Sequence, residues 1–344
     1  MIQEILKRFS RKVFTGEDFL FLLNVEDEQD FQPVFEYSEK ICESVYGRDV
    51  FVRGILEFSN ICTRNCFYCG LRKGNDRLKR YRMKPDEIFK EVRKVSEKGI
   101  RTIVLQSGED DHFTDEIMAS LLERIKKNFN MAITLSIGER SYESYKQLKE
   151  AGADRFLLRI ETSDEKLFKR LHPDGNFQQR KKCLHFLKEL GYELGTGIMV
   201  GLPGQSCSSL VKDIFFFKEV GADMIGIGPF LSHQDTPLRN FRPRKFFLTL
   251  KVLALIRCLL PDVNIPATTA MGTIDPQGRQ KALAAGANVI MPNLSPAVYR
   301  PLYQLYDNKI CVYETSANCL SCTEEIVRQA GKTVCLGRGD RIKQ

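Results

Sequence analysis

The chain has 344 residues, of which 43% are hydrophobic and 28% are charged, and its formal net charge is +8. This composition is typical of a folded protein with a large core and argues against intrinsic disorder. Apolar runs are too short to span a membrane, and charges interrupt "MIQEILKRFSRKVFTGEDF" at the start too often for a signal-peptide core. We therefore expect a cytoplasmic protein without a membrane partner.

A recurrent pattern organises most of the chain into helix-strand units. Residues 1–48 read as an N-terminal helical segment, and after them charged, helix-like segments end near a glycine and lead into short apolar runs. Left-handed backbone geometry at a helix end favours glycine, and nearly continuous apolar runs are typical of strands buried on both faces of a parallel sheet. The glycines in this position are Gly99, Gly152, Gly191, Gly221 and Gly286.

Eight strands are predicted in this way, and they alternate with helices. In chain order they lie in FVRGILEF (51–58), TIVLQ, MAITLS (131–136), RFLLRI, GIMVG, MIGIGPF, VNIPATT (263–269) and NVIMPN. Eight such units predict an α/β fold with a complete (β/α)8 barrel of the TIM type, spanning 49–292, followed by a C-terminal extension, 293–344. Chemistry in such a barrel belongs at the carboxyl ends of the strands.

Three cysteines follow the first predicted strand. Cys62, Cys66 and Cys69 have the spacing C-x3-C-x2-C. Clustered thiols in a reducing compartment more often bind metal or do redox chemistry than form disulfides. A structural zinc ion needs four protein ligands, and a fourth would have to come from a distant part of the chain. A 4Fe-4S cluster held by three thiolates instead leaves one iron open for a further ligand.

The segment EFSNICTRNCFYCGLR resembles the cysteine motif of the radical S-adenosylmethionine (SAM) enzymes. That resemblance implies that the amino and carboxylate groups of SAM chelate the open iron, and that one electron from the cluster cleaves SAM to a 5′-deoxyadenosyl radical. TIVLQSGED, GIMVGLPGQ, GIGPF, IPATTAMGTI and ANVIMPN extend the resemblance to the HydE family of FeFe-hydrogenase maturases over almost the whole chain. Biotin synthase and methylornithine synthase share the first motif.

The resemblance assigns a set of residues to the cofactor. Tyr68 would lie near the adenine, Glu161 would accept from the amino group or the ribose hydroxyls, and Arg180 would pair with the carboxylate. A zwitterionic amino acid needs one anionic and one cationic partner in a site of low dielectric constant. At the end of the second strand, Gln106, Ser107 and Gly108 would receive the amino group. Three weaker candidates complete the set: Ser136, Met199 and Met224. For each methionine, ordinary core packing is the alternative.

The substrate side of the cavity is predicted to contain Arg53, Thr134, Arg159, Thr268, Thr269 and Tyr303. Two of these are arginines within apolar strands, where each needs an anionic partner; a structural pair with Glu57, Glu161 or a helix end is the alternative. The resemblance implies a small organometallic or amino-acid-like substrate, an iron synthon with carbonyl, cyanide and cysteine ligands. It also implies an electron donor protein and other hydrogenase maturation proteins as partners.

A second cysteine group lies in CVYETSANCLSC, at Cys311, Cys319 and Cys322. It resembles the residues that hold a second iron–sulfur cluster in some HydE members, and Cys335 is a candidate fourth ligand. Free thiols on a surface turn, or adventitious zinc, are the alternatives, and we expect the group to be dispensable for SAM cleavage. The four histidines have no metal-binding spacing.

Positive charge is concentrated in LRKGNDRLKRYRMK, 71–84. This segment could dock an acidic electron donor or partner protein, although a solvated loop and helix start is the simpler interpretation. No nucleic-acid motif accompanies it. Two other functions remain open at this level: a methylornithine synthase-like or other radical SAM enzyme acting on an amino acid, and a zinc-stabilised barrel that serves as a binding protein.

Overall fold

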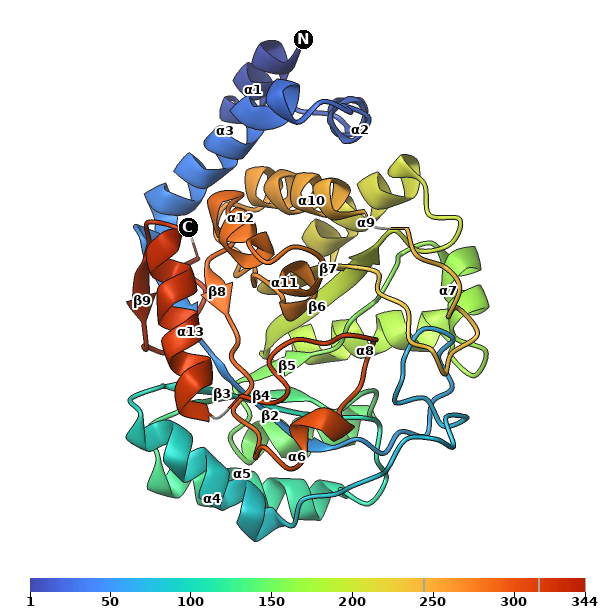
Figure 1. Cartoon of the computed structure of the whole chain (residues 1–344), viewed down its shortest axis with the longest axis vertical. Coiled ribbons are helices and arrows are strands. Elements are labelled where there is room, and N and C mark those ends of the chain that lie inside the picture. The colour runs from blue at the N-terminus through green and yellow to red at the C-terminus, as the bar shows by residue number, and fades with distance from the viewer. Residues whose placement is uncertain (244, 315, 344) are drawn as a thin grey trace.

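The computed structural model describes residues 1–243, 245–314 and 316–343. Three helices come first: α1 (Ile2–Ser10), α2 (Gly16–Leu23) and α3 (Glu28–Tyr46). Asp27 starts α3 by accepting the Gln29 amide at 2.7 Å, and Gly47 follows its end with φ +59°. Figure 1 shows these helices above α9 and α10, outside the strands. The Phe19 ring of α2 contacts Phe215 of α9 at 5.1 Å between ring centres, which fixes this layer on the rest of the chain.

The main sheet is parallel and has six strands in chain order. They are β2 (Gly54–Ser59), β3 (Thr102–Ser107), β4 (Ala132–Ser136), β5 (Arg155–Leu157), β6 (Glu193–Val200) and β7 (Met224–Pro229). Their residues are almost all buried, as expected of parallel strands covered on both faces. This confirms the predicted parallel α/β architecture.

A smaller sheet continues from the first strand. It has the order β8-β1-β9, where β1 is Asp49–Val52, β8 is Val289–Ile290 and β9 is Thr333–Cys335. The single strand predicted at 51–58 is therefore two strands, divided at Arg53, and β9 was not predicted at all. The strand predicted at 263–269 is reduced to two bridges, from Asn264 to Met224 and from Pro266 to Val289, and the chain is helical from Thr269.

Single bridges join the two sheets. Beyond those on the 263–269 segment, Ile55 of β2 pairs with Asn293, just after β8. Backbone hydrogen bonds accompany this pairing, from Ile55 N to Pro292 O at 2.9 Å and from Leu294 N to Ile55 O at 2.8 Å. The strands nevertheless do not form one continuous eight-stranded ladder among the described residues, so the complete barrel stays a prediction.

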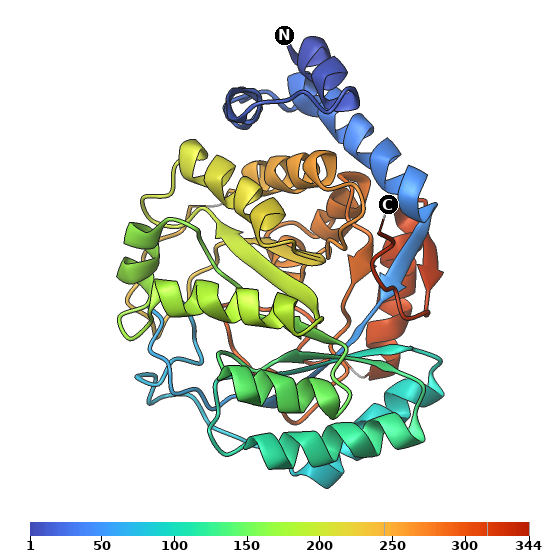
Figure 2. The same ribbon diagram turned by 180° about the vertical axis from the view of Figure 1, so that it is seen from behind.

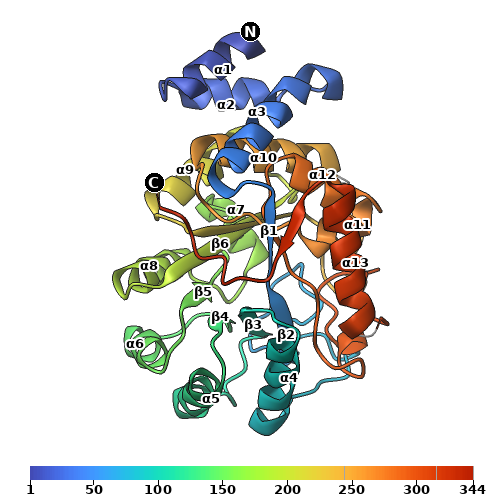
Figure 3. The same ribbon diagram turned by 90° about the vertical axis from the view of Figure 1, so that its left-hand side faces the viewer.

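Helices surround the strands. Figure 3 shows α4, α5, α6 and α8 arranged around the sheet, each with one face toward it. In α4, for example, Ile88, Phe89, Val92 and Val95 recur at helical spacing and are buried, while the other residues between Ile88 and Val95 are charged. The helices are α4 (Pro85–Glu97), α5 (Asp115–Asn128), α6 (Tyr142–Glu150), α7 (Glu165–Leu171), α8 (Phe177–Glu189), α9 (Cys207–Glu219), α10 (Phe246–Leu259), α11 (Thr269–Ile274) and α12 (Gly278–Ala284). Within the described ranges, none of the helices has the length and apolar character that a membrane crossing requires.

The C-terminal part of the chain crosses both ends of the strands. The short 3-10 helix η1 (Arg300–Leu302) lies at their carboxyl end, and α13 (Ser316–Gln329) leads to β9. The last residues then run beneath the amino-terminal end of the sheet, as the red segment in Figure 2 shows. There Arg155 donates to the carbonyl of Arg338 at 2.9 Å and pairs with Asp340. The C-terminal tail therefore covers the amino-terminal end of the strands, which we call the floor of the fold.

Candidate active site

The three cysteines of the first group lie in the loop that connects β2 to α4, at the carboxyl end of the strands. All three are free and half-buried. Arg80 fixes the loop by donating to the carbonyls of Asn60 at 2.7 Å and Leu71 at 2.8 Å, and to two more carbonyls in the same loop. The loop has no regular secondary structure of its own, so these bonds hold the cysteine backbone in place.

Burial and mutual proximity make the thiolate forms of these cysteines costly. Burial and the neighbouring Cys62 raise the pKa of Cys69 to about 12, and burial together with the two other thiols raises the pKa of Cys66 further. As thiolates, the three groups therefore need a positively charged centre among them. Among the described residues, no three His, Cys, Asp or Glu side chains converge closely enough to hold one metal ion. An iron–sulfur cube suits the wider spacing, because each thiolate binds a different iron.

The end of β3 lies against the cysteine loop. Gly108 donates its amide to the carbonyl of Ser59 at 3.1 Å. A Cβ atom at Gly108 would lie 2.2 Å from the carbonyl oxygen of Ile61 and 2.7 Å from the Cβ of Cys62, so only glycine allows this close approach. The predicted residue Gly108 is thus brought next to Cys62, and Gln106 and Ser107 precede it at the end of β3.

The segment after β5 brings the predicted charged residues together. Glu161 has φ +64°, a left-handed conformation that is strained for a residue with a side chain and is often found at functional sites. Arg159 Nε lies 2.9 Å from Glu161 Oε1, while the second carboxylate oxygen, Oε2, is buried without a hydrogen-bond partner among the described residues. Arg180 donates to the carbonyl of Arg159 at 2.6 Å.

Arg180 also belongs to an ion-pair chain that the sequence analysis did not predict. It donates to Glu139 at 2.5 Å, Glu139 lies 3.2 Å from Arg64, and Arg64 donates to Glu109 at 2.6 Å. The chain connects α8, the ends of β3 and β4, and the cysteine loop. Nearby carboxylates raise the pKa of Arg180, chiefly that of Glu139, so its guanidinium stays charged. Glu109 in "SGED" and Glu139 in "SIGE" each follow the end of a predicted strand, and this position is the sequence signal that could have indicated a role in the site.

Tyr68 is held by a histidine that sequence reasoning set aside. Its hydroxyl lies 2.8 Å from His172 Nε2, and His172 Nδ1 lies 2.9 Å from the carbonyl oxygen of Phe168. Burial lowers the pKa of His172 to about 4, so the imidazole is neutral. Because a carbonyl only accepts, the proton lies on Nδ1, and Nε2 accepts from the tyrosine. Tyr68 and Met199 pack against the same small apolar cluster, which includes Phe230.

The inner face of β6 and β7 carries little side-chain volume. Gly197 pairs in register with Gly226, and their neighbours on the same face are Gly195 and Gly228. A Cβ atom at Gly226 would make an ordinary van der Waals contact with Arg159 Nη1 at 3.7 Å, so the backbone of β7 faces that guanidinium without a side chain between them. On β4, Thr134 is fully buried, and its hydroxyl has no hydrogen-bond partner among the described residues. A buried polar atom without a partner requires an explanation, and a binding site for a polar ligand is one.

The mouth is closed on one side by the chain after β8. Tyr303 is 2% exposed and lies beside the side chain of Gln106, which brings a predicted substrate residue next to a predicted cofactor residue. Gln106 is in register with Ser136 on β4, so both face the same side of the sheet. Thr268 precedes α11 and donates to the carbonyl of Ile227 at 3.2 Å, and Thr269 begins that helix; both are half-buried.

Glu57 on β2 is a further buried charge at this level. Its carboxylate binds Lys309 Nζ at 2.6 Å and Asn293 Nδ2 at 2.7 Å. The Lys309 ammonium also donates to the carbonyl of Tyr303 at 3.2 Å. Because Glu57 pairs in register with Gln106, this ion pair lies directly beside the predicted cofactor residues. A glutamate within an apolar strand was visible in the sequence, although it was considered only as a partner for Arg53.

Comparison with known proteins identifies the family. The sequence pattern described as the Radical SAM superfamily matches residues 56–217. The FeFe hydrogenase maturase subunit HydE of Thermotoga maritima is 50% identical over 330 residues, which cover 96% of this chain and 94% of that protein. The chain belongs to the HydE family. It is therefore a radical SAM enzyme of the hydrogenase maturase type.

More distant relatives share the fold. The 3-methylornithine synthase of Methanosarcina acetivorans is 29% identical over 84% of each chain. The crystal structure of methylornithine synthase (PylB) superposes with a TM-score of 0.83, at 23% identity, covering 96% of this chain and 97% of that one. HydG from Carboxydothermus hydrogenoformans gives 0.82 at 22% identity, covering 97% of this chain and 79% of that one. The HydE relative is much more similar in sequence than the synthase, which favours the maturase over the predicted alternative.

Membership of the radical SAM family implies a 4Fe-4S cluster and SAM, and the HydE residues described here fit both groups. Three neighbouring thiols need a cationic centre, and the strands behind them leave an unpartnered carboxylate oxygen, Glu161 Oε2, and an unpartnered hydroxyl on Thr134. On β7, Gly226 lies next to the Arg159 guanidinium and Gly228 lies next to the Thr268 hydroxyl, so two predicted substrate residues face this strand.

Two predicted residues lie elsewhere in this HydE chain. Met224 begins β7 and Arg53 precedes β2, so both are at the amino-terminal end of the strands, about five residues or roughly 17 Å from the cysteine loop. Arg53 donates to Met224 Sδ at 2.9 Å and to the carbonyl of Gly339 at 2.8 Å. Their placement gives the predicted binding roles no support.

The second cysteine group lies near the start of α13. Cys311 and Cys319 lie close enough that each shifts the pKa of the other, and Cys322 is exposed, with its sulfur 3.8 Å from Arg279 Nη2. Cys335 lies on β9, in the smaller sheet. The three predicted members are therefore grouped around one end of α13, although they do not converge as a single-ion site within the described residues.

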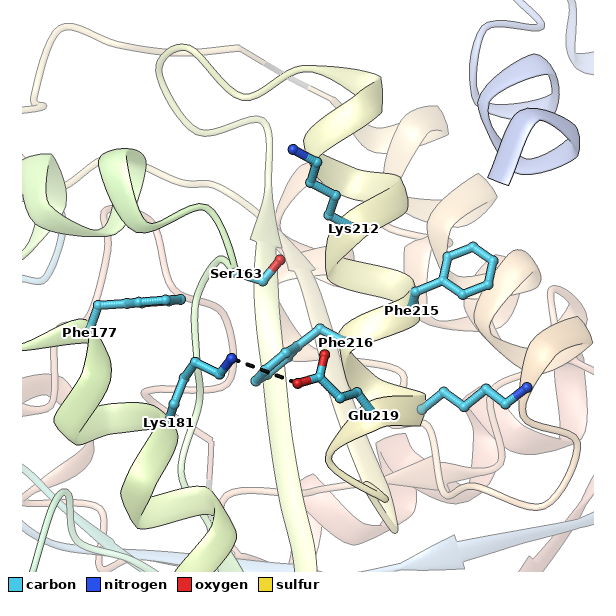
Figure 4. Close-up of a pocket in the computed structure, with 8 residues that line it drawn as sticks. Ser163, Phe177, Lys181, Lys212, Phe215, Phe216 and Glu219 are labelled. Carbon is cyan, nitrogen blue, oxygen red and sulfur yellow. Dashed lines mark ion pairs between the residues drawn. The ribbon is translucent and has the colours of Figure 1, made fainter. Parts of the chain in front are cut away.

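Two surface hollows differ in their relation to the site. A cleft of about 450 Å³ lies beside the mouth, between the segment after β7 and the end of α11; Ser232, Arg242 and Thr273 help to line it. A groove of about 720 Å³ lies on the outer surface between α8 and α9. Figure 4 shows Lys181 of this groove pointing from α8 toward Glu219 on α9, 3.7 Å away. None of the residues lining the outer groove belongs to the cysteine loop, so it is not part of the active site.

Proposed function

We propose that the chain takes part in FeFe-hydrogenase maturation by cleaving SAM reductively and acting on a small iron complex bound among the strands. The observation that carries this proposal is the 50% identity to a HydE maturase over nearly the full length of both chains. The complex would carry carbonyl, cyanide and cysteine ligands, as the family resemblance implies. We place the reaction in the cytoplasm.

We propose that Cys62, Cys66 and Cys69 hold the cluster and that SAM completes its coordination. The bound pair would supply a one-electron cleavage of the sulfonium and a 5′-deoxyadenosyl radical. The contribution of the loop is positional, because Arg80 and Gly108 fix its backbone against the strand ends. Half-burial of the thiols limits the access of water to the site.

The charged residues after β5 are suited to the methionine part of SAM. Glu161 Oε2 is an unpartnered buried acceptor for the amino group. Arg180 supplies positive charge, but its Nε is already bound to Glu139. We propose that Arg180 orients the carboxylate of SAM through its remaining guanidinium edge and that the adenine lies against Tyr68 and Met199, while Ser136 and the end of β3 close the other side.

We propose that the substrate lies deeper among the strands, in contact with Arg159, Thr134 and Tyr303, and with Thr268 and Thr269 near the mouth. The cysteine-like carboxylate of the iron complex would pair with Arg159, whose guanidinium lies beside Gly226, a residue without a side chain. Arg53 we assign to the floor, because its guanidinium is bound to the C-terminal tail.

We also propose a complete barrel in which 49–292 form the catalytic unit, 1–48 pack on its outside and 293–344 form an extension. The single bridges at Asn264, Pro266 and Asn293 support this closure. The second cysteine group would hold a peripheral iron–sulfur cluster, and the proximity of Cys311 to Cys319 supports it. A protein electron donor and other maturation proteins such as HydG would be the partners.

Anaerobic reconstitution with iron and sulfide tests the proposal. The parent should bind about four irons at the first site, the content of one 4Fe-4S cluster, and should release 5′-deoxyadenosine products from SAM when reduced. Cys66→Ser should lose both properties, because it removes one of the three thiolate ligands. Deleting the gene should abolish FeFe-hydrogenase activity. A cell that keeps active hydrogenase after the deletion, or a protein that consumes lysine in the manner of the alternative synthase, would refute the maturase function.

A further inference from the structure

The loop that carries the cysteines concentrates most of the excess positive charge of the protein. Residues 60–84 contain eight lysines and arginines and one acidic residue, Asp76, whereas the chain as a whole has 52 basic and 44 acidic residues. The rest of the chain is therefore nearly balanced. An excess of one sign on one segment creates a local potential that attracts partners of the opposite charge.

Internal ion pairs neutralise only part of this charge. Carboxylates outside the loop pair with Arg64, with Arg77 at 3.1 Å and with Arg82 at 2.8 Å. Among the described residues, the remaining basic side chains form no ion pair: Arg72, Lys73, Lys79, Arg80 and Lys84. Lys73 and Lys79 are exposed. The uncompensated charge therefore faces solvent.

The same segment is the outer cover of the cysteines. Arg80 interacts electrostatically with Cys62 and Cys69, and its guanidinium binds the carbonyls of Arg72 and Asn75. The amide of Lys73 donates to the carbonyl of Arg64, two residues before Cys66, at 2.7 Å. Figures 1 and 2 show this light-blue segment at the margin of the molecule, beside α7 and away from the N-terminal helices. A protein that docks here reaches the cysteines without crossing the ring of helices.

We propose that Lys73 and Lys79, with Arg72 and Arg80 behind them, form the docking surface for an acidic one-electron carrier protein. We name this surface the cysteine-loop face. The inference rests on the proposed function, because reductive cleavage consumes one electron for each SAM molecule. The carrier is oxidised by one electron, which passes to the cluster site; no proton moves, and the oxidised carrier leaves.

Charge complementarity explains why the carrier is acidic. Opposite charges at the rim of an interface raise the association rate, and their effect falls with salt because the charges are screened. Lys212 and Lys218 provide a matched control pair, because they are exposed lysines like Lys73 and Lys79 but line the α8–α9 groove, away from the cysteine loop. Both residues belong to α9, and Figure 4 shows Lys212 on this helix, on the outer side of the strands.

The test uses the reconstituted full chain with flavodoxin as the acidic carrier. Three variants are compared with the parent: Lys73→Glu/Lys79→Glu, the neutral Lys73→Gln/Lys79→Gln, and the control Lys212→Glu/Lys218→Glu. Binding of oxidised flavodoxin is measured by fluorescence anisotropy at low and moderate salt. SAM cleavage is measured separately with reduced flavodoxin and with dithionite, a small reductant that needs no docking surface.

We expect the charge reversal to weaken flavodoxin binding about tenfold or more at low salt, the neutral variant to show an intermediate loss, and the control to match the parent. Cleavage driven by dithionite should be unchanged in all three. Equal binding by parent and cysteine-loop variants would overturn the proposal, and so would a loss confined to the α9 control. Absence of dithionite-driven cleavage in the parent would instead refute the proposed function itself.

Discussion

The buried ion pair between Glu57 and Lys309 offers a quantitative test of how the mouth of the site is held together. The exposed fractions of these two side chains are 4% and 9%, and their charged atoms are 2.6 Å apart. The pair connects β2 with the C-terminal segment that carries Tyr303. Changing Glu57→Gln keeps the shape of the side chain and an oxygen for Asn293, but it leaves the ammonium group of Lys309 without its counter-ion.

The expected loss of stability is large for a single oxygen-to-nitrogen change. Breaking a buried ion pair by removing one partner costs about 3–5 kcal/mol, because the other charge stays buried. With an unfolding entropy of about 2.1 cal/mol/K per residue, a chain of this length should lose on the order of 4–7 °C in Tm. Lys309→Met should cost a comparable amount, since it leaves the carboxylate of Glu57 unpaired.

Removing both charges should restore most of the stability, because no unpaired buried charge remains. The free energies of unfolding of the parent, both single variants and Glu57→Gln/Lys309→Met form a double-mutant cycle, measured by anaerobic thermal unfolding at one scan rate. We expect a coupling energy of about 2 kcal/mol or more. If the two single losses simply add in the double variant, the pair does not stabilise the mouth and the reasoning is wrong.

Three further predictions concern other groups. Burial raises the pKa of Asp213 to about 7, above its unfolded value of 3.8. The folded state therefore binds an extra proton, and stability should fall as the pH rises from about 4 through 7. Asp213→Asn should remove that slope and make the protein more stable than the parent in unfolding measurements at about pH 8. His172→Phe removes the acceptor for the Tyr68 hydroxyl and should weaken SAM binding about tenfold by equilibrium titration, whereas adding Tyr68→Phe should recover most of the loss. Cys322→Ser should leave the rate of 5′-deoxyadenosine formation within about twofold of the parent, because this exposed thiol lies within α13 and not at the strand ends. Loss of that product would contradict a peripheral role.

Local patterns predicted the strands that lie fully inside the sheet. The apolar runs at β3, β4, β6 and β7 and the glycines at helix ends depend on neighbours in sequence, so their positions were visible there. The same reasoning failed where pairing partners are distant. The 51–58 run is divided at Arg53 because its first half pairs with β8 and β9, which come from the end of the chain.

The candidate site shows the same division. The cysteine spacing and the polar residues at the ends of the strands predicted where the site lies. The structure places Tyr68, Glu161, Arg180 and the end of β3 around the cysteine loop. It was wrong to treat all polar residues within strands as one group, since residues of one strand lie at different depths. Arg53 and Met224 lie at the amino-terminal end of the strands, because Arg53 precedes β2 and Met224 begins β7, while Glu57 and Gln106 lie near the carboxyl end.

By itself, the sequence determined the family, the parallel α/β architecture and the three thiols, because these depend on residue type and short spacing. Only the tertiary structure decided which charges meet: Glu57 with Lys309, Arg180 with Glu139, Arg155 with the C-terminal tail, and Tyr68 with His172. The physical reason is that a buried charge or hydroxyl must find a partner wherever the folded chain provides one. Among these four pairs the partners lie up to 252 residues apart, so no local pattern specifies them.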